Sequence, residues 1–341
     1  MQIRNVLLIY TGGTIGMIND PATGALKPFD FRQIKSEVPE LSKIACHIDS
    51  VSFDDPIDSS NMNPDVWRKL VKLIQQHYED YDGFVVLHGT DTMAYSASAL
   101  SFMIQDLNKP IVFTGSQLPI GIIRTDGKEN LITAIEIAST YENGAPKVPE
   151  VSVYFEYKLY RGNRTTKLSS AHFNAFASFN YPLLAEAGIE IKFNQNAISI
   201  NKGNDPNYFY ELENDIGILQ LHPGISKKHV KHFFKSPELK AIILQTFGAG
   251  NAPTESWFID ELKSANKEGM ILVNVTQCLS GGVNQEKYET GRGLVSAGVI
   301  SGGDLTIEAA LSKLMYLLGR YEDRDTVKRL FGKNIVGEIS N

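Results

Sequence analysis

Apolar runs alternate along the chain with stretches in which apolar residues recur at helical spacing, and polar or glycine-rich turns separate the two. Short continuous apolar runs predict buried strands, whereas a spacing of three and four residues predicts helices with one apolar face. The alternation therefore predicts an α/β protein. The predicted strands are residues 3–10, 48–53, 84–87, 110–114, 150–157, 217–221, 241–245 and 270–276; the predicted helices are 65–79, 93–104, 128–141, 254–267, 305–318 and 326–331, with one more beginning at Ser226.

The regular pattern fails between Asn194 and Asn214, where several asparagines precede Asp205-Pro206. A polar stretch of this kind is typical of a connection between domains, and 341 residues exceed the usual size of one domain. Strand–helix alternation on both sides favours right-handed crossovers and largely parallel sheets. We expect a larger N-terminal domain, residues 1–193, with a mostly parallel sheet flanked by helices. A linker at 194–214 and a smaller α/β domain at 215–341 follow.

Composition narrows the class of protein. Hydrophobic residues make up 43% of the chain and the formal net charge is -6, which argues against a nucleic-acid or membrane partner. The basic stretch 226–235 is explained by a solvated helix face. Cys46 and Cys278 form no metal or redox motif, and no apolar run is long enough to cross a bilayer. We expect a cytoplasmic protein without a metal site.

The turn GTDT, residues 89–92, lies between the predicted strand 84–87 and the predicted helix 93–104. Open α/β sheets bind their ligands at the carboxyl ends of strands. This turn carries two hydroxyls and a carboxylate there, beside a glycine that permits close approach of the backbone. A helix N-cap is the alternative interpretation, because Thr and Asp often cap helices.

The first predicted strand ends in TGGTIG, residues 11–16. Its glycine spacing differs from the G-x-G-x-x-G of dinucleotide-binding folds, and the prolines and glycines that follow exclude an immediate helix. We therefore expect the turn to expose the Thr14 hydroxyl and backbone N–H groups, with residues 18–30 as a mobile flap over them. A plain glycine-rich turn is the alternative.

Two further polar clusters are candidates for the same site. Asp58, Ser59 and Ser60 offer a carboxylate, hydroxyls and backbone N–H groups that suit a small zwitterion, although the neighbouring Asn63-Pro64 also makes a good helix start. Lys167 ends the polar stretch KLYRGNRTTK. An amine in a half-buried site can serve as a base, whereas a solvated lysine is the default interpretation.

Together these groups suit acyl transfer. A threonine hydroxyl becomes a good nucleophile only when a neighbouring base removes its proton. Lys167, positioned by Asp91, is a candidate base that acts through Thr90, and backbone N–H groups beside the glycines are candidates to hold an oxyanion. The predicted chemistry is acyl transfer to water by way of a threonyl ester, provided that the turns meet in the fold.

Six motifs resemble those of the type I, cytoplasmic bacterial L-asparaginases, and the resemblance covers the whole chain. TGGTIG together with HGTDTM at this separation is far more specific than either motif alone. The resemblance implies an asparaginase-like two-domain fold with a catalytic N-terminal domain, and hydrolysis of L-asparagine to L-aspartate and ammonia without a cofactor. It also implies that Thr14 is the acylated nucleophile, with Thr90, Asp91 and Lys167 as a second, triad-like set. The motifs are TGGTIG (11–16), DSS (58–60), HGTDTM (88–93), TGSQLP (114–119), YRGNRTTK (160–167) and FGAGNAP (247–253).

The resemblance also implies how the substrate is held. Asp58, Ser59, Ser60 and Asp91 would bind the α-carboxylate and α-amino group of asparagine, and Ser116 would lie nearby.

Similar enzymes pair two chains so that each active site borrows side chains from its neighbour, commonly in a dimer of dimers. The resemblance therefore implies a homodimer or tetramer of this chain, with Asn251 as one borrowed residue. Many relatives carry a tyrosine on the flap, where this chain has Ala25 and Leu26. Tyr288 in the C-terminal domain is a candidate substitute.

Some relatives of this type bind asparagine at a second, activating site between subunits. Thr166 and Cys278 match positions associated with that site, but Gln245 stands where a basic residue is expected. The resemblance therefore implies feeble activation. Two rivals remain: the amidotransferase subunit that releases ammonia for tRNA-bound glutamate, expected to carry an extra N-terminal domain, and a non-catalytic amino-acid sensor, expected to lack the catalytic threonines or lysine.

Overall fold

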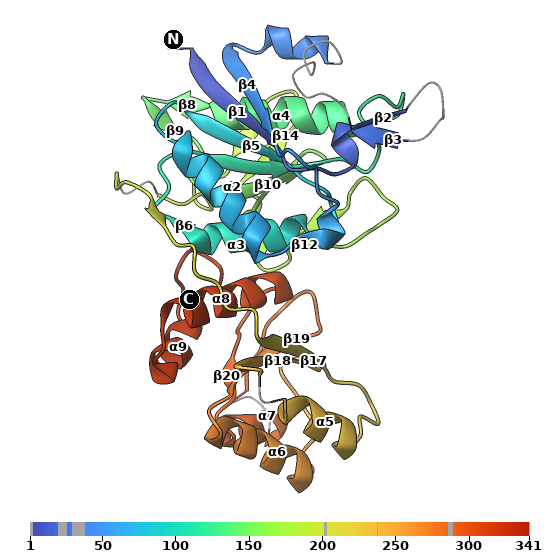
Figure 1. The fold of residues 1–341 in the computed structure, drawn as a ribbon, viewed down its shortest axis with the longest axis vertical. Coiled ribbons are helices and arrows are strands. Elements are labelled where there is room, and N and C mark those ends of the chain that lie inside the picture. The colour runs from blue at the N-terminus through green and yellow to red at the C-terminus, as the bar shows by residue number, and fades with distance from the viewer. Residues whose placement is uncertain are drawn as a thin grey trace. The chain divides into compact units, whose positions relative to one another are not determined.

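The predicted strands of the N-terminal half belong to one eight-stranded sheet, whose order is β15-β14-β11-β10-β7-β5-β1-β4 (Figure 1). The computed structural model describes residues 3–19, 26–28, 38–200, 203–236, 238–285 and 289–340. All pairs from β4 to β10 are parallel, as predicted, whereas the three short strands at the other edge are antiparallel and were not predicted. The strands are β1 (Arg4–Tyr10), β4 (Cys46–Ser52), β5 (Gly83–Leu87), β7 (Ile111–Thr114), β10 (Val151–Phe155), β11 (Lys158–Arg161), β14 (Ala185–Ala187) and β15 (Ile191–Phe193).

Helices pack against the sheet where the apolar periodicity predicts them. They are α2 (Pro64–Gln76), α3 (Met93–Met103) and α4 (Gly127–Ser139). The buried face of α4 packs with alternate residues of β1 and β5 in one core cluster. The prediction of a single apolar face on α3 was wrong, because every residue of this helix except Tyr95 is buried. Its alanines and serines are small enough for the helix to be enclosed among α2, β10 and a short 3-10 helix, η5 (Gly162–Arg164).

This unit also contains several short strands and 3-10 helices. The predicted flap begins and ends as an antiparallel strand pair, β2 (Met17–Asn19) with β3 (Leu26–Pro28), and its remaining residues, 20–25 and 29–30, lie outside the described residues. The other short elements are η1 (Thr14–Gly16), η3 (Pro39–Lys43), η4 (Ser59–Asn61), β6 (Ile104–Gln105), β8 (Tyr141–Glu142), β9 (Ala145–Pro146), β12 (Thr166–Lys167), β13 (Phe176–Ala177) and β16 (Asn207–Tyr208).

The chain divides into two units, Met1–Tyr210 and Glu211–Asn341, so the division falls inside the predicted linker 194–214. Much of that stretch packs on the first unit. The Arg161 guanidinium donates to the carbonyl of Ala197 and to the Ser199 hydroxyl, both at 2.9 Å, and β16 pairs with β6. Polar groups of the first unit thus hold a segment that lacks an apolar pattern of its own.

The second unit has a parallel sheet in the order β17-β18-β19-β20, so the predicted two-domain α/β fold is confirmed. Inside this unit the Lys313 ammonium and the Glu338 carboxylate form a fully buried ion pair at 2.5 Å. Removal of one partner of such a pair usually costs roughly 3–5 kcal/mol. The elements are β17 (Ile216–Gln220), α5 (Lys227–Phe234), β18 (Ala241–Thr246), α6 (Ser256–Lys267), β19 (Ile271–Thr276), α7 (Glu289–Ser296), β20 (Ile300–Ser301), α8 (Ile307–Arg320) and α9 (Arg324–Phe331).

Candidate active site

The turns that follow β1 and β5 are in close contact at the carboxyl ends of these parallel strands. A Cβ on Gly13 would lie 2.5 Å from the backbone nitrogen of Gly89, and one on Gly12 would lie 2.1 Å from the carbonyl oxygen of Ile57. Both glycines also have positive φ, 136° at Gly12 and 91° at Gly13. Only residues without a side chain fit this contact, so the glycines of TGGTIG bring its turn against HGTDT.

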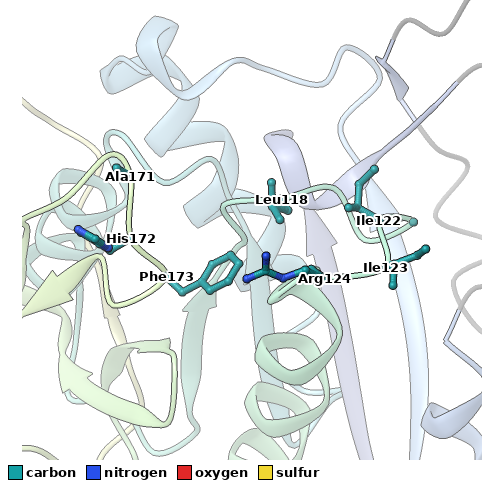
Figure 2. Close-up of a pocket in the computed structure, with 8 residues that line it drawn as sticks. Leu118, Ile122, Ile123, Arg124, Ala171, His172 and Phe173 are labelled. Carbon is teal, nitrogen blue, oxygen red and sulfur yellow. The ribbon is translucent and has the colours of Figure 1, made fainter.

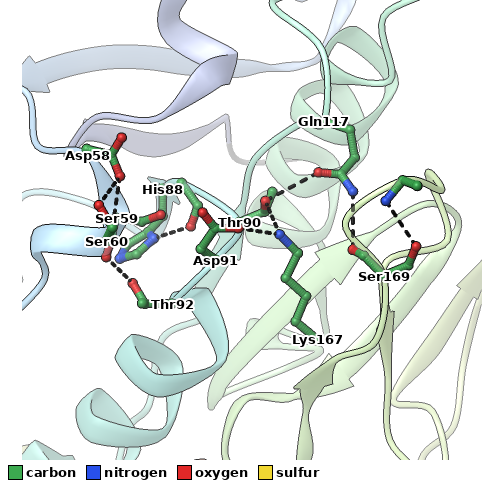
Figure 3. A network of polar contacts seen from close by, with 12 residues as sticks. Asp58, Ser59, Ser60, His88, Thr90, Asp91, Thr92, Gln117, Lys167 and Ser169 are labelled. Atoms are coloured by element: carbon green, nitrogen blue, oxygen red, sulfur yellow. Dashed lines mark hydrogen bonds and ion pairs between the residues drawn. The ribbon is translucent and has the colours of Figure 1, made fainter.

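Lys167 lies on β12 and reaches the turn after β5 (Figure 3). Its Nζ is 2.8 Å from the Thr90 Oγ1 and 2.6 Å from the Asp91 Oδ1. The Lys167 side chain is only 16% exposed, whereas that of Asp91 is 66% exposed. The default interpretation of a solvated lysine is therefore wrong, and the three predicted groups meet.

Hydrogen-bond directions around Thr90 identify a residue that the sequence analysis did not single out. A lysine ammonium can only donate, so the Thr90 oxygen accepts from Lys167 and its own proton points to the Gln117 Oε1, 3.3 Å away. The Gln117 Nε2 donates to the carbonyl of His172 at 3.0 Å and to that of Ser169 at 3.5 Å. Figure 3 shows the contact with Ser169. Gln117 follows the end of β7 inside the motif TGSQLP, and this motif and position were its signals in the sequence.

The polar turn after β5 does not cap the helix that follows it. Thr92 occupies the N-cap position of α3, but no side chain caps the helix there. The Thr92 hydroxyl instead donates to the carbonyl of Ser59 at 2.7 Å. The N-cap interpretation is thus wrong, and the hydroxyls and carboxylate of this turn contact other loops.

The DSS loop forms the adjoining wall. A Cβ on Gly89 would lie 2.6 Å from the Ser59 Oγ, so this buried hydroxyl packs directly on the turn after β5. The Asp58 carboxylate accepts from the Ser60 N–H and hydroxyl, both at 2.8 Å, and these bonds hold the pKa of Asp58 below its usual range. A negatively charged Asp58 suits a cationic group of a ligand. The helix start is a separate feature, because Asn63 caps α2.

Thr14 and Ser116 differ in their surroundings. Thr14 begins η1 at the same glycine contact, and within the described residues its hydroxyl makes no hydrogen bond to another side chain. Ser116 is buried, and its hydroxyl donates to the carbonyl of Leu118 at 2.6 Å. Substrate contact by either residue therefore stays a prediction.

A buried hydrogen-bond chain lies behind the turn after β5. The Trp67 indole donates to the Ser96 hydroxyl at 2.8 Å. That hydroxyl donates to the His88 Nε2 at 2.8 Å, because the other ring nitrogen faces a carbonyl oxygen, which can only accept, and therefore carries the proton of the neutral ring. The His88 Nδ1–H then donates to the carbonyl of Gly89 at 2.7 Å. This sequence of donors fixes one tautomer of a neutral imidazole, and burial lowers the pKa of His88 to about 4.

Acidification is expected to destabilise the fold through His88. Between pH 6.5 and about 4 the unfolded chain binds a proton on this imidazole that the native protein does not. The free energy of unfolding should therefore fall by about 3 kcal/mol across that window and be independent of His88 above it. Urea unfolding at several pH values, compared between the wild type and His88→Gln, measures this slope. Equal slopes, or an imidazole that titrates near pH 6.5 by NMR, would contradict it.

The remaining predicted site residues are spread over both units. Thr166 precedes Lys167 on β12, whereas Gln245 lies on β18 and Cys278 is an exposed free thiol. Asn251 pairs with Phe247 through a backbone bridge in the second unit. Tyr288 lies outside the described residues.

A cavity of about 790 Å³ adjoins the site, between the loop after β7 and the loop after β12 (Figure 2). None of the predicted catalytic side chains lines it. The lining residues are Leu118, Gly121, Ile122, Ile123, Arg124, Ala171, His172 and Phe173.

Across the described ranges, no group of three or more His, Cys, Asp and Glu side chains has the arrangement of a metal site. Nor does any described helix combine the length and the apolar character needed to cross a membrane.

Comparisons with known proteins cover both units. The family model "Asparaginase, N-terminal" matches residues 5–199, and "Glutaminase/Asparaginase C-terminal domain" matches residues 215–331. L-asparaginase 1 of Escherichia coli (strain K12) is 42% identical over 351 residues, which cover 100% of this chain and 99% of that protein. The 60 kDa lysophospholipase of Mus musculus is 40% identical over 99% of this chain, which spans 63% of that longer protein. The crystal structure of L-asparaginase I from Vibrio cholerae O1 biovar eltor str. N16961 superposes with a TM-score of 0.90 at 39% identity, with complete coverage of both chains.

Proposed function

The chain belongs to the asparaginase family, and on that basis we propose that it hydrolyses the side-chain amide of L-asparagine to L-aspartate and ammonia. The observation that carries the proposal is the contact of the Lys167 amine with both Thr90 and Asp91. An amine beside a hydroxyl is a proton acceptor in place for acyl chemistry, and the neighbouring turn presents a second hydroxyl, Thr14.

In the first step the Thr14 oxygen attacks the amide carbon of asparagine. The C–N bond breaks, the nitrogen takes up the proton that the Thr14 hydroxyl has lost and leaves as ammonia, and an aspartyl ester forms on Thr14. The negative charge that develops on the amide oxygen needs hydrogen-bond donors in place beforehand, and backbone N–H groups of the glycine-rich turns are suited to this task.

In the second step water hydrolyses the ester. Thr90 passes a proton from the attacking water towards Lys167, which serves as the base, and the Thr14 oxygen leaves with a proton. The Asp91 carboxylate orients the amine at 2.6 Å.

The zwitterionic end of asparagine is assigned to the DSS loop and Asp91. Asp58 is negatively charged. Both hydrogen bonds from Ser60 end on its Oδ1, so its Oδ2 is the atom proposed to accept from a ligand ammonium group. Ser59 and Ser60 supply hydroxyl and N–H groups that suit the α-carboxylate, and Ser116 lies on the loop after β7.

The test is ammonia and aspartate release from L-asparagine by the purified chain, with L-glutamine as the paired substrate. We expect kcat/KM for glutamine to be lower by about 10–200-fold, since a pocket fitted to one chain length discriminates by roughly 1–3 kcal/mol per methylene. Absence of amide hydrolysis would overturn the proposal in favour of an amino-acid sensor, and equal rates on both amides would overturn the assigned specificity.

We propose a homodimer that shares active sites, further paired into a tetramer. The resemblance assigns Asn251 as a contribution from a neighbouring chain, and Tyr288 of the C-terminal domain as a substitute for a flap tyrosine. Light scattering on the purified protein distinguishes monomer, dimer and tetramer. A monomer with full activity would exclude shared sites. The cytoplasmic location stays a prediction.

Activation by a second asparagine is proposed to be feeble. The site suggested by Thr166 and Cys278 would need a cation for the effector carboxylate, but the Gln245 side chain is a neutral amide. The dependence of initial rate on asparagine concentration is therefore expected to be hyperbolic. A clearly sigmoidal curve that Thr166→Val abolishes would contradict this expectation.

A further inference from the structure

Asp126 occupies the N-cap position of α4, yet its side chain does not cap the helix. Asp at this position normally accepts from the first N–H groups of its own helix and contributes about 0.5–2 kcal/mol to stability. Here the neighbouring Thr125 hydroxyl accepts from the Gly127 N–H instead, at 2.9 Å. The Asp126 carboxylate is thus directed to something other than its own helix.

The carboxylate binds the loop that follows β7. Its oxygens accept from the Gln117 N–H at 2.9 and 3.1 Å and from the Leu118 N–H at 3.1 Å. One turn further along α4, the buried Asn130 amide donates to the same carboxylate at 3.3 Å and to the carbonyl of Gly115 at 3.0 Å. Two side chains of one rigid helix therefore hold the backbone from Gly115 to Leu118.

The held backbone carries the residue that touches Thr90. Gln117 extends its Oε1 to the Thr90 hydroxyl at 3.3 Å and its Nε2 to the carbonyl of His172 at 3.0 Å. We propose that Asp126 is a positioning residue for the hydrolysis, which sets the Gln117 backbone and thereby the position of the Thr90 oxygen relative to Lys167.

The choice of a carboxylate agrees with this task. An ionised carboxylate only accepts hydrogen bonds, so several N–H groups can converge on it, whereas an amide would present two donors to the same loop. Burial raises the pKa of Asp126, and the hydrogen bonds from Gln117, Leu118 and Asn130 oppose that shift because they stabilise the ionised carboxylate. A residue needed only for the start of α4 would cap the helix from a solvated position.

The inference rests on the proposed function, because the role of Thr90 comes from it. The experiment is steady-state kinetics of asparagine hydrolysis by Asp126→Asn, which keeps the shape but removes the charge and one acceptor. We expect kcat to fall by about 10–100-fold while KM changes less than about threefold, since misplacement of a catalytic group acts mainly on the chemical step. Asp323→Asn is the matched control: Asp323 is also an N-cap aspartate, but it caps its own helix, α9, in the second unit, and its replacement should leave kcat unchanged.

A double-mutant cycle separates positioning from mere stability. If Asp126 acts through Gln117, then Asp126→Asn combined with Gln117→Met should lower kcat no further than the more severe single change. Additive losses in kcat, or a lower melting temperature with normal kcat, would overturn the proposal. Asp126→Glu, which retains the charge but displaces it by one methylene, gives the same comparison if the asparagine variant does not fold.

Failure of the proposed function would be visible separately. An inactive wild type would refute asparagine hydrolysis, but amide hydrogen exchange at Gln117 and Leu118 would still report on the carboxylate. Exchange there should accelerate in Asp126→Asn and remain unchanged in Asp323→Asn. If exchange does not accelerate, Asp126 does not hold this loop, whatever the enzyme catalyses.

Discussion

Thr14→Val is expected to reduce kcat for asparagine hydrolysis by roughly 10⁴-fold or more, the scale of loss when a covalent nucleophile is removed. Valine has nearly the shape of threonine but no hydroxyl, so the change removes the attacking oxygen with little effect on packing. Thr14 lies at the contact between the turns after β1 and β5, where space is restricted by Gly13 and Gly89. Substrate binding should survive, because the DSS loop and Asp91 are unchanged.

The measurement is single-turnover and steady-state kinetics, with Thr14→Ser as the variant that keeps a hydroxyl and should retain activity. Thr133→Val is the matched control, since the Thr133 hydroxyl donates to Glu129 on α4 and is not one of the predicted site residues. Rapid acid quenching followed by mass spectrometry should locate an aspartyl ester on the peptide that contains Thr14. Full activity of Thr14→Val, or an ester on Thr90, would reassign the nucleophile.

Lys167→Met is expected to lower kcat by about 10²–10⁴-fold, the usual contribution of a general base. Methionine has a side chain of similar length, so it occupies the same space beside β12 but carries no amine. Without the amine, the Thr90 hydroxyl loses its partner at 2.8 Å and Asp91 loses its partner at 2.6 Å. The proton from the attacking water then has no acceptor.

Lys147→Met serves as the control for loss of a lysine, because Lys147 pairs with Glu142 away from the site. The combined variant Thr90→Val with Lys167→Met should be about as slow as Lys167→Met alone, because the two residues act as one unit. The pH dependence of kcat should also lose the limb that reports the base. Independent, additive losses would mean that Lys167 and Thr90 serve different steps.

Local pattern in the sequence was sufficient for most of the fold. Buried runs such as 84–87 and 241–245 became β5 and β18 with bounds within a residue, because such runs lie in a central parallel sheet where both faces are apolar. The three antiparallel strands β11, β14 and β15 were missed, since β14 and β15 are three residues each and partly exposed. The sequence located the boundary between the two units only to the polar stretch 194–214. Hydrogen bonds from Arg161 attach part of that stretch to the first unit, and no local pattern indicates them.

Candidate residues with chemistry at strand ends were likewise identified from the sequence. Thr90, Asp91 and Lys167 were singled out because each follows or ends a structured segment with an unusual set of polar groups, and the structure brings all three together. Gln117, His88 and Asp126 were not, because glutamine, a lone histidine and an N-cap aspartate look ordinary until their partners are known.

The amino-acid sequence alone determined the α/β class, the order of the main elements, and the residue types available at the carboxyl ends of the strands. These depend on periodicity and turn chemistry, which act over a few residues. Only the tertiary structure decided that Lys167, 77 residues after Thr90, donates to it, and that Asp126 serves the loop after β7 rather than its own helix. Such contacts arise because parallel strands place distant turns at one edge of a sheet, and no local pattern records which turns meet.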